Sequence, residues 1–167
     1  MKSGIMRGAF AAAAFGLLST SVFALEKQPV LSLDVARKMA ATCEAMAITK
    51  GWKMNIAVVD AGANTILFER MNGSFFGSGE IALNKAQTSA KFPFPTRFVE
   101  ELAYGKAGKP VAVPGLVHVP GIIAFAGGLP LMAAGAHIGG IGVSGGTADE
   151  DEVCAQAGIE SVKALLN

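Results

Sequence analysis

Two histidines, His118 and His137, are the side chains of this 167-residue sequence best suited to bind a metal ion or transfer a proton. His118 lies in the segment GLVHVPG, where it alternates with apolar residues, and His137 lies in a glycine-rich run. A single histidine in a strand is more often structural than a ligand, so both interpretations stay open for each. No CxxC motif or Cys/His cluster is present, so we do not expect a structural zinc site.

Catalytic groups at a recognisable spacing are scarce. The sequence contains no Ser/His/Asp order, no evident carboxylate pair and no metal-ligand spacing. Asp60 and Glu69 flank an expected hairpin and share no obvious site. His137 together with Lys85 would suit acid–base chemistry on a small carboxylic acid, and this combination alone keeps an enzymatic function open.

Aromatic and polar side chains near flexible loops are candidates for a ligand pocket. Four phenylalanines flank glycine- and proline-rich loops, where they would wall an apolar pocket or fill an ordinary core: Phe75, Phe76, Phe92 and Phe94. Lys85 and Arg97 are candidate partners for a ligand carboxylate, with solvated surface charge as the alternative. Further polar candidates near the same expected cleft are Asn72, Thr96 and the backbone of Gly127 and Gly128.

The glycine-rich run from residue 135 to 146 invites comparison with a phosphate-binding loop, but its chemistry argues against one. The acids at positions 149–152 would open the following helix, complement its dipole and repel a phosphate, so we interpret them as helix-capping residues. Glycines without side chains admit a close neighbour. The neighbour is expected to be a helix packed on the strand, with a flat ligand or an oligomer contact as alternatives; the glycines concerned are Gly135, Gly139, Gly140 and Gly142.

Hydrophobic periodicity and turn residues predict an α+β domain. Helices are expected from Ser32 to Gly51, over 80–92, from Thr96 to Tyr104 and over 148–166, the last opened by a Thr147–Glu150 capping box. Strands are expected over 54–59 and 65–71, near 117–119, and over 121–126 and 137–143, with a corner at Gly127-Gly128. This order predicts a central antiparallel sheet with helices packed against it.

The amino terminus resembles a cleaved signal peptide. Lys2 and Arg7 precede a short apolar stretch, and Val22 and Ala24 fit a signal-peptidase site, which predicts a signal over residues 1–24, with an uncleaved anchor as the alternative. Residues 25–167 would then form a single domain in the periplasm or outside the cell. Without the two signal cations, 12 basic residues face 13 acidic ones, so no nucleic-acid or membrane partner is expected after cleavage.

Only two cysteines are present, Cys43 and Cys154, each at an apolar position of an expected helix. Two buried thiols are the first interpretation. The alternative is a disulfide that closes a long loop, which an oxidising compartment would permit.

Three segments resemble the GlcG/HbpS-like haem-binding (haem-degrading) family, which includes the C-terminal domain of PduO-type corrinoid adenosyltransferases. They are ALNKAQTSAKFPFPT (82–96), GGLPLM (127–132) and IGGIGVSGGTADEDEVCAQAGIES (138–161), within a resemblance that spans about residues 30–166. The resemblance implies a three-layer α-β-α, profilin-like fold around a five-stranded antiparallel sheet. It also implies homo-oligomers, from dimers to octamers.

The same resemblance implies that haem, or a related tetrapyrrole, is the cofactor, with a role in haem handling or redox sensing. His118 and His137 are the only histidines that could hold the iron, and the resemblance does not choose between them. Lys85 and Arg97 would pair with the propionates. The alternatives are a small enzyme or accessory protein acting on organic acids or aromatic catabolites, and an assembly module without a ligand.

Overall fold

The computed structural model describes residues 27–166, so the predicted signal peptide lies outside the described residues. Within this range four strands form one antiparallel sheet in the order β2-β1-β4-β3: β1 (Asn55–Asp60), β2 (Thr65–Arg70), β3 (Gly128–Ala133) and β4 (Ala136–Ser144). The α+β class is confirmed, but the expectation of five strands was wrong. In the described part of the chain, no helix has both the length and the apolar character that a membrane span requires.

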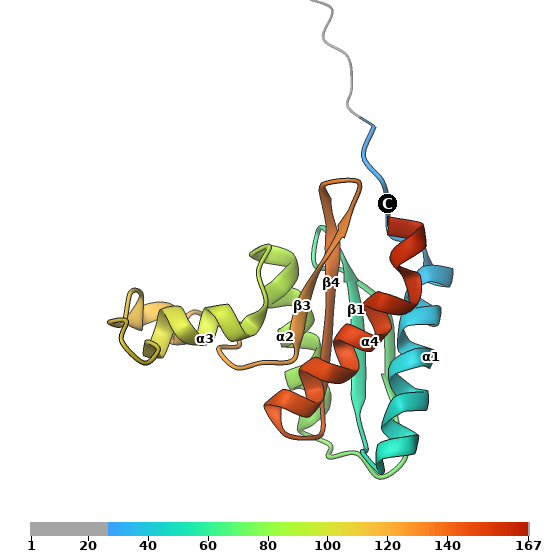
Figure 1. Cartoon of the computed structure of the whole chain (residues 1–167), viewed down its shortest axis with the longest axis horizontal. Helices are drawn as coiled ribbons and strands as arrows, with labels where there is room; N and C mark the ends of the chain where they lie inside the picture. Colours follow the sequence, from blue (N-terminus) through green and yellow to red (C-terminus); the bar gives the residue numbers. More distant parts are fainter. Residues whose placement is uncertain (1–26, 167) are drawn as a thin grey trace, which may run out of the picture.

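The helices and the sheet form three layers (Figure 1). On one face lie α1 (Leu33–Lys50) and α4 (Ala148–Leu166), which bury the larger apolar core with Ile56, Val58 and Ile141 of the sheet. On the other face lies α2 (Ser78–Lys91), which packs its alanines on Ala57 and Val59. Because successive strand residues point to opposite faces, β1 contributes to both cores.

The helix ends follow the residues that the sequence places there. The Ser32 hydroxyl caps α1 by accepting a hydrogen bond from the backbone N–H of Val35, and Gly51 ends the helix in a left-handed conformation. At α4, the Glu150 carboxylate accepts from the backbone N–H of Thr147, while the Thr147 hydroxyl accepts from the N–H of Glu150. The predicted capping box is therefore confirmed.

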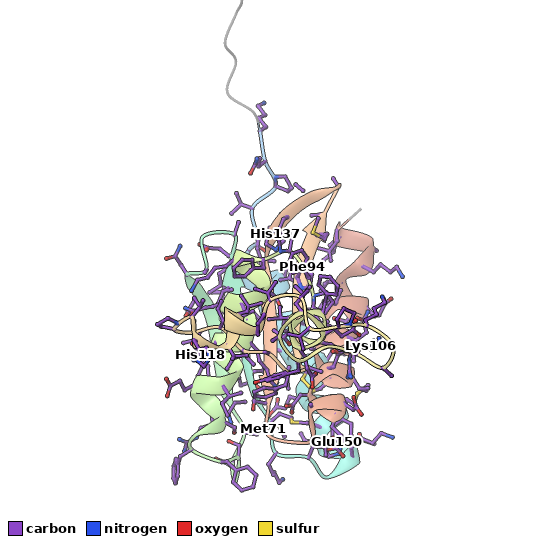
Figure 2. All side chains as sticks on the ribbon, turned by 90° about the vertical axis from the view of Figure 1, so that its left-hand side faces the viewer. Met71, Phe94, Lys106, His118, His137 and Glu150 are labelled. Carbon is purple, nitrogen blue, oxygen red and sulfur yellow. A yellow bond between two sulfur atoms is a disulfide. The ribbon has the colours of Figure 1, made fainter. Side chains whose placement is uncertain are left out.

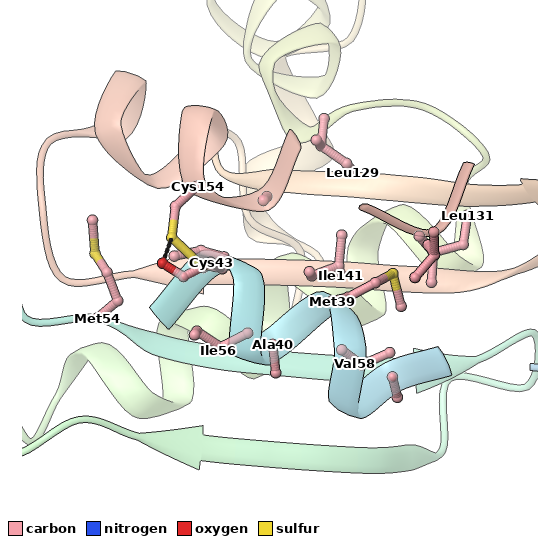
Figure 3. Close-up of a cluster of buried hydrophobic side chains, with 14 of the residues drawn as sticks. Met39, Ala40, Cys43, Met54, Ile56, Val58, Leu129, Leu131, Ile141 and Cys154 are labelled. Atoms are coloured by element: carbon pink, nitrogen blue, oxygen red, sulfur yellow. Dashed lines mark hydrogen bonds between the residues drawn. A yellow bond between two sulfur atoms is a disulfide. The ribbon is translucent and has the colours of Figure 1, made fainter. Parts of the chain in front are cut away.

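A disulfide joins the two helices of the larger core. Cys43 of α1 and Cys154 of α4 are fully buried and bonded to each other (Figure 3). The first interpretation, two buried thiols, was wrong, because α1 and α4 pack side by side and bring the two Cα atoms within 4.8 Å.

An arm stands out from the sheet beside α2 (Figure 1). It contains α3 (Thr96–Tyr104) and the short 3₁₀ helix η1 (Pro114–His118), held together by a small apolar cluster around Val99. The strands expected near 117–119 and over 121–126 were wrong, because Pro114 and Pro120 interrupt the pairing and Gly121 turns the chain at positive φ. The expected corner is present at Gly127, which lies in a bend at positive φ directly before β3 begins at Gly128.

The glycines of β4 allow the backbone of neighbouring elements to pack closely against this strand. A Cβ on Gly140 or Gly142 would lie 2.3 or 2.1 Å from carbonyl oxygens of α2, and one on Gly139 would lie 2.1 Å from the carbonyl oxygen of Val59. The expected close packing of a helix on the strand is thus confirmed for Gly140 and Gly142, and Gly139 admits the neighbouring strand. Gly135 has open space around it and serves the β3–β4 turn at positive φ.

Candidate functional site

Lys85 occupies the middle of the interface between α2 and the sheet, and its side chain has no exposed surface. Its Nζ donates to Asp151 Oδ2 at 2.7 Å and to the carbonyl oxygen of Val143 at 3.0 Å. The ammonium also lies 4.7 Å from the centre of the Phe125 ring, which provides a cation–π contact. All of its bonding capacity is therefore used inside the protein.

Burial governs the protonation of this pair. Removal from water lowers the pKa of Lys85 and raises the pKa of Asp151, while the contact between them opposes both shifts. Asp151 Oδ1 also accepts a 3.0 Å hydrogen bond from the backbone N–H of Gly146, at the start of α4. Asp151, one of the four acids interpreted as capping residues, thus also connects α4 to α2 through its contact with the buried Lys85.

Four candidate ligand residues do meet in space: Lys85, Thr96, Gly127 and Gly128. They form a closed cluster rather than a pocket, because a Cβ on Gly127 would lie 2.6 Å from Lys85 Nζ and one on Gly128 would lie 2.5 Å from the Lys85 carbonyl oxygen. The Thr96 hydroxyl accepts a 2.9 Å hydrogen bond from the N–H of Gly128. The polar groups of this cluster therefore bond to one another in the structure, and their role in ligand binding stays a prediction.

Arg97 is committed to the same acidic turn. Its Nε donates to Glu152 Oε1 at 3.0 Å, and its guanidinium also contacts Asp149. Arg97 therefore ties α3 to the start of α4 and is not a free partner for a ligand carboxylate. Asn72 is exposed in the loop after β2.

The two histidines lie on different elements and differ in their surroundings (Figure 2). His137, on β4, is half-buried, and its Nε2 lies 3.1 Å from the carbonyl oxygen of Ser89 in α2. Since a carbonyl oxygen only accepts, Nε2–H is the donor in this contact. His118 ends η1 on the arm, is exposed, and has no hydrogen-bond partner among residues 27–166.

The acid–base combination of His137 and Lys85 is not available in this fold. The Lys85 ammonium points to Asp151 and has no exposed surface, whereas His137 contacts the last turns of α2.

At the hairpin, backbone and side-chain hydrogen bonds from Asn64 lower the pKa of Asp60, which stabilises the turn. Burial and the nearby carboxylate of Glu44 raise the pKa of Glu69. No group of three potential metal ligands from His, Cys, Asp and Glu occurs in the described chain.

The candidate phenylalanines divide into two groups. Phe92 and Phe94 belong to an aromatic row at the base of the arm, where Phe94 also contacts the Phe98 ring edge-on. Phe75 and Phe76 lie in the loop before α2 and are largely exposed, so neither fills the core. Phe76 borders an open groove of 350 Å³ between β2 and α2, whose lining is Phe68, Arg70, Phe76, Gly79, Glu80 and Leu83.

Two functional features were missed from the sequence. Asp151 sits in a run of four acids that look alike in sequence, so no local signal distinguished its inward-facing side chain. Arg70, at the end of β2, lies over the Phe76 ring, with its guanidinium carbon 4.8 Å from the ring centre. The available signal was its spacing of two residues from Phe68, which places both side chains on the same face of the strand.

Comparisons with known proteins agree with the fold. A family model described as "Haem degrading protein HbpS-like" matches residues 31–160. An uncharacterized 15.0 kDa protein from the dhaT-dhaS intergenic region of Citrobacter freundii is 34% identical over 135 residues, which cover 81% of this chain and 94% of that protein.

Two solved structures extend this likeness. A double mutant of HbpS from Streptomyces reticuli is 32% identical, with 96% of this chain and 99% of that chain covered and a TM-score of 0.73. A complex of PduOC with heme is 24% identical over 80% of this chain and 95% of that chain, with a TM-score of 0.72, and at that identity it shows the fold alone. The chain belongs to the HbpS-like family of haem-degrading proteins.

Proposed function

We propose that this protein is an exported, oligomeric haem-binding protein in which His118 provides the axial ligand to the iron. The observation that carries this proposal is the state of the His118 imidazole, which is exposed and has no protein partner within residues 27–166. Val113 and Val119, which border η1, are exposed as well, so apolar surface for a flat macrocycle is present in the same segment. Haem is commonly held by such an imidazole, and it supplies redox-active iron chemistry when bound.

The choice of haem, or of a closely related tetrapyrrole, is supported by the family. Its description names haem degradation, and a protein of the same fold, PduOC, has been solved with heme bound. The chemistry of the donor set fits, because both ring nitrogens of His118 are available to a ligand. His137 fits less well: its Nε2 is held by Ser89, and Nδ1 lies next to the histidine's own backbone.

Export is supported by two independent observations. The predicted signal peptide over residues 1–24 directs the chain to the periplasm or the exterior. The disulfide between Cys43 and Cys154 is the kind of bond that persists in oxidising compartments. Because both cysteines are fully buried, external thiols and other reductants have poor access to this bond, so haem handling is better supported than redox sensing through the disulfide.

Haemin titration of the mature chain tests the proposal. We expect a saturable Soret band for the wild type, a loss of affinity of about 10-fold or more for His118→Ala, and an unchanged titration for the matched control His137→Ala. Absence of any Soret shift in the wild type would contradict haem binding. Loss of haem binding only in His137→Ala would show that His137 on β4, and not His118, provides the axial ligand.

A further inference from the structure

One surface carries aromatic side chains that the fold leaves uncovered. We define the β2–α2 face as the groove between β2 and α2 together with the loop that precedes α2; its side chains are Phe68, Arg70, Phe75, Phe76, Glu80 and Leu83. Phe75 is 73% exposed, Phe76 is 83% exposed and Phe68 is 45% exposed. Phe68 and Phe76 line the same groove and Phe75 precedes Phe76 in the loop, and apolar side chains at such exposure mark an interaction surface.

The charges of this face argue for a partner that carries both signs. Arg70 and Glu80 line the same groove, and neither has an ion-pair partner within residues 27–166. An anionic small molecule would meet the Glu80 carboxylate as well as the Arg70 guanidinium. A second copy of the same surface, related by a two-fold axis, would instead place Arg70 against Glu80 in both directions.

The two edges of the sheet are not equivalent. The Met71 N–H donates to the Met54 carbonyl oxygen at 3.0 Å, and this register directs the backbone groups of Phe68 and Arg70 away from β1. At the opposite edge, Pro130 pairs with Gly140 at the corresponding outward position of β3, where proline supplies no N–H. Among residues 27–166, the β2 edge therefore keeps backbone donors without a partner beside the exposed phenylalanines, and the β3 edge is blocked at its centre.

We propose that the β2–α2 face is a two-fold interface between copies of this chain, in which Phe68 and Phe76 of each copy pack together and Arg70 of one pairs with Glu80 of the other. The inference rests on the oligomeric part of the proposed function and assigns a surface to it. Burial of the aromatic side chains provides the affinity, and the reciprocal ion pairs fix the orientation of the two copies.

Charge exchange at this face tests the interface. We expect Arg70→Glu and Glu80→Arg each to weaken the dimer about 10-fold or more, because each variant places like charges in contact. An equimolar mixture of the two variants should form heterodimers, since both contacts then join opposite charges. Sedimentation velocity and light scattering over a concentration series measure the dissociation constants, with Lys38→Glu on the exposed face of α1 as the charge-matched control.

The possible results separate the surface from the function. Arg70 and Glu80 are exposed, and circular dichroism and Tm verify that each variant folds. Phe76→Ser, in an exposed loop, should weaken the same dimer without a charge change. If all three variants assemble like the wild type, the β2–α2 face is not the interface, although the protein is still an oligomer. A wild type that stays monomeric would overturn both the interface and the oligomeric claim, while the haemin titration would still decide haem binding.

Discussion

At the scale of single residues, the most constrained group is the buried pair of Lys85 and Asp151. Desolvation of two charges is costly, and it is offset by their short contact, by the hydrogen bonds to Val143 and Gly146, and by the cation–π contact with Phe125. The pair connects α2 to α4 beside the carboxyl end of the inner strand β4, so it links helices that cover opposite faces of the sheet. Its value lies in fixing this arrangement rather than in net stabilisation.

Removing one partner should therefore cost more than removing both charges. We expect Lys85→Met to lower the free energy of unfolding by about 3–5 kcal/mol, because Asp151 is left as an uncompensated buried carboxylate. In Lys85→Met/Asp151→Asn, most of that loss should be recovered, since the amide oxygen still accepts from Gly146 and no charge remains. Urea unfolding of the three proteins measures the difference, and equal losses in the single and double variants would contradict this account.

How far the site could be predicted differs from residue to residue. The importance of Lys85 was visible, because it lies among small residues on one face of a helix. Its partner was not, because the four acids at 149–152 look alike in sequence and only the crossing of α4 over the sheet selects Asp151. Arg97 was taken as available for a ligand because its contacts with Asp149 and Glu152 span more than 50 residues of sequence.

At the scale of elements, the pairing of α2 with β4 decides how the three layers fit. Small residues on both sides bring the helix backbone close to the strand backbone, with Ala82 and Ala86 of α2 facing Gly142 and Gly140. Such an interface has no side chains that can rearrange when volume is added. The glycine pattern of β4 is therefore a reliable sequence signal of close packing.

A single methyl group should disturb this interface strongly. In Gly142→Ala, the new Cβ would lie 2.1 Å from the carbonyl oxygen of Ala82, so the helix must move away from the sheet. We expect a loss of about 3 kcal/mol in the free energy of unfolding. The control Gly115→Ala, where nothing lies within 4 Å of the added Cβ, should stay within about 0.5 kcal/mol of the wild type. Similar values for both variants in thermal and urea unfolding would refute the packing argument.

The elements with local signals were predicted well and those without were not. Ser32, Gly51 and Thr147 mark helix ends through their own hydrogen bonds, so α1 and α4 followed from sequence alone. The segment around residues 111–126 is rich in valine, but prolines and a glycine at positive φ remove the pairing that valine favours. There β propensity gave the wrong answer because no neighbouring strand is present to pair with.

At the scale of the whole molecule, the disulfide between Cys43 and Cys154 connects the first and last helices of the described fold. It spans 111 residues of sequence, so it strongly restricts the unfolded chain. We expect Cys43→Ala/Cys154→Ala to lose about 4 kcal/mol in the free energy of unfolding, as measured by urea unfolding under non-reducing conditions. A loss below about 1 kcal/mol would show that the bond adds little beyond the packing of α1 on α4.

The position of this bond also shapes how the molecule responds to damage. Nearly every exposed loop, including the whole arm, lies between the two bonded cysteines. A protease that cuts the backbone once in any of those loops leaves two fragments that are still covalently joined. Such a nicked molecule would migrate as an intact chain in a non-reducing gel until a reductant separates its fragments.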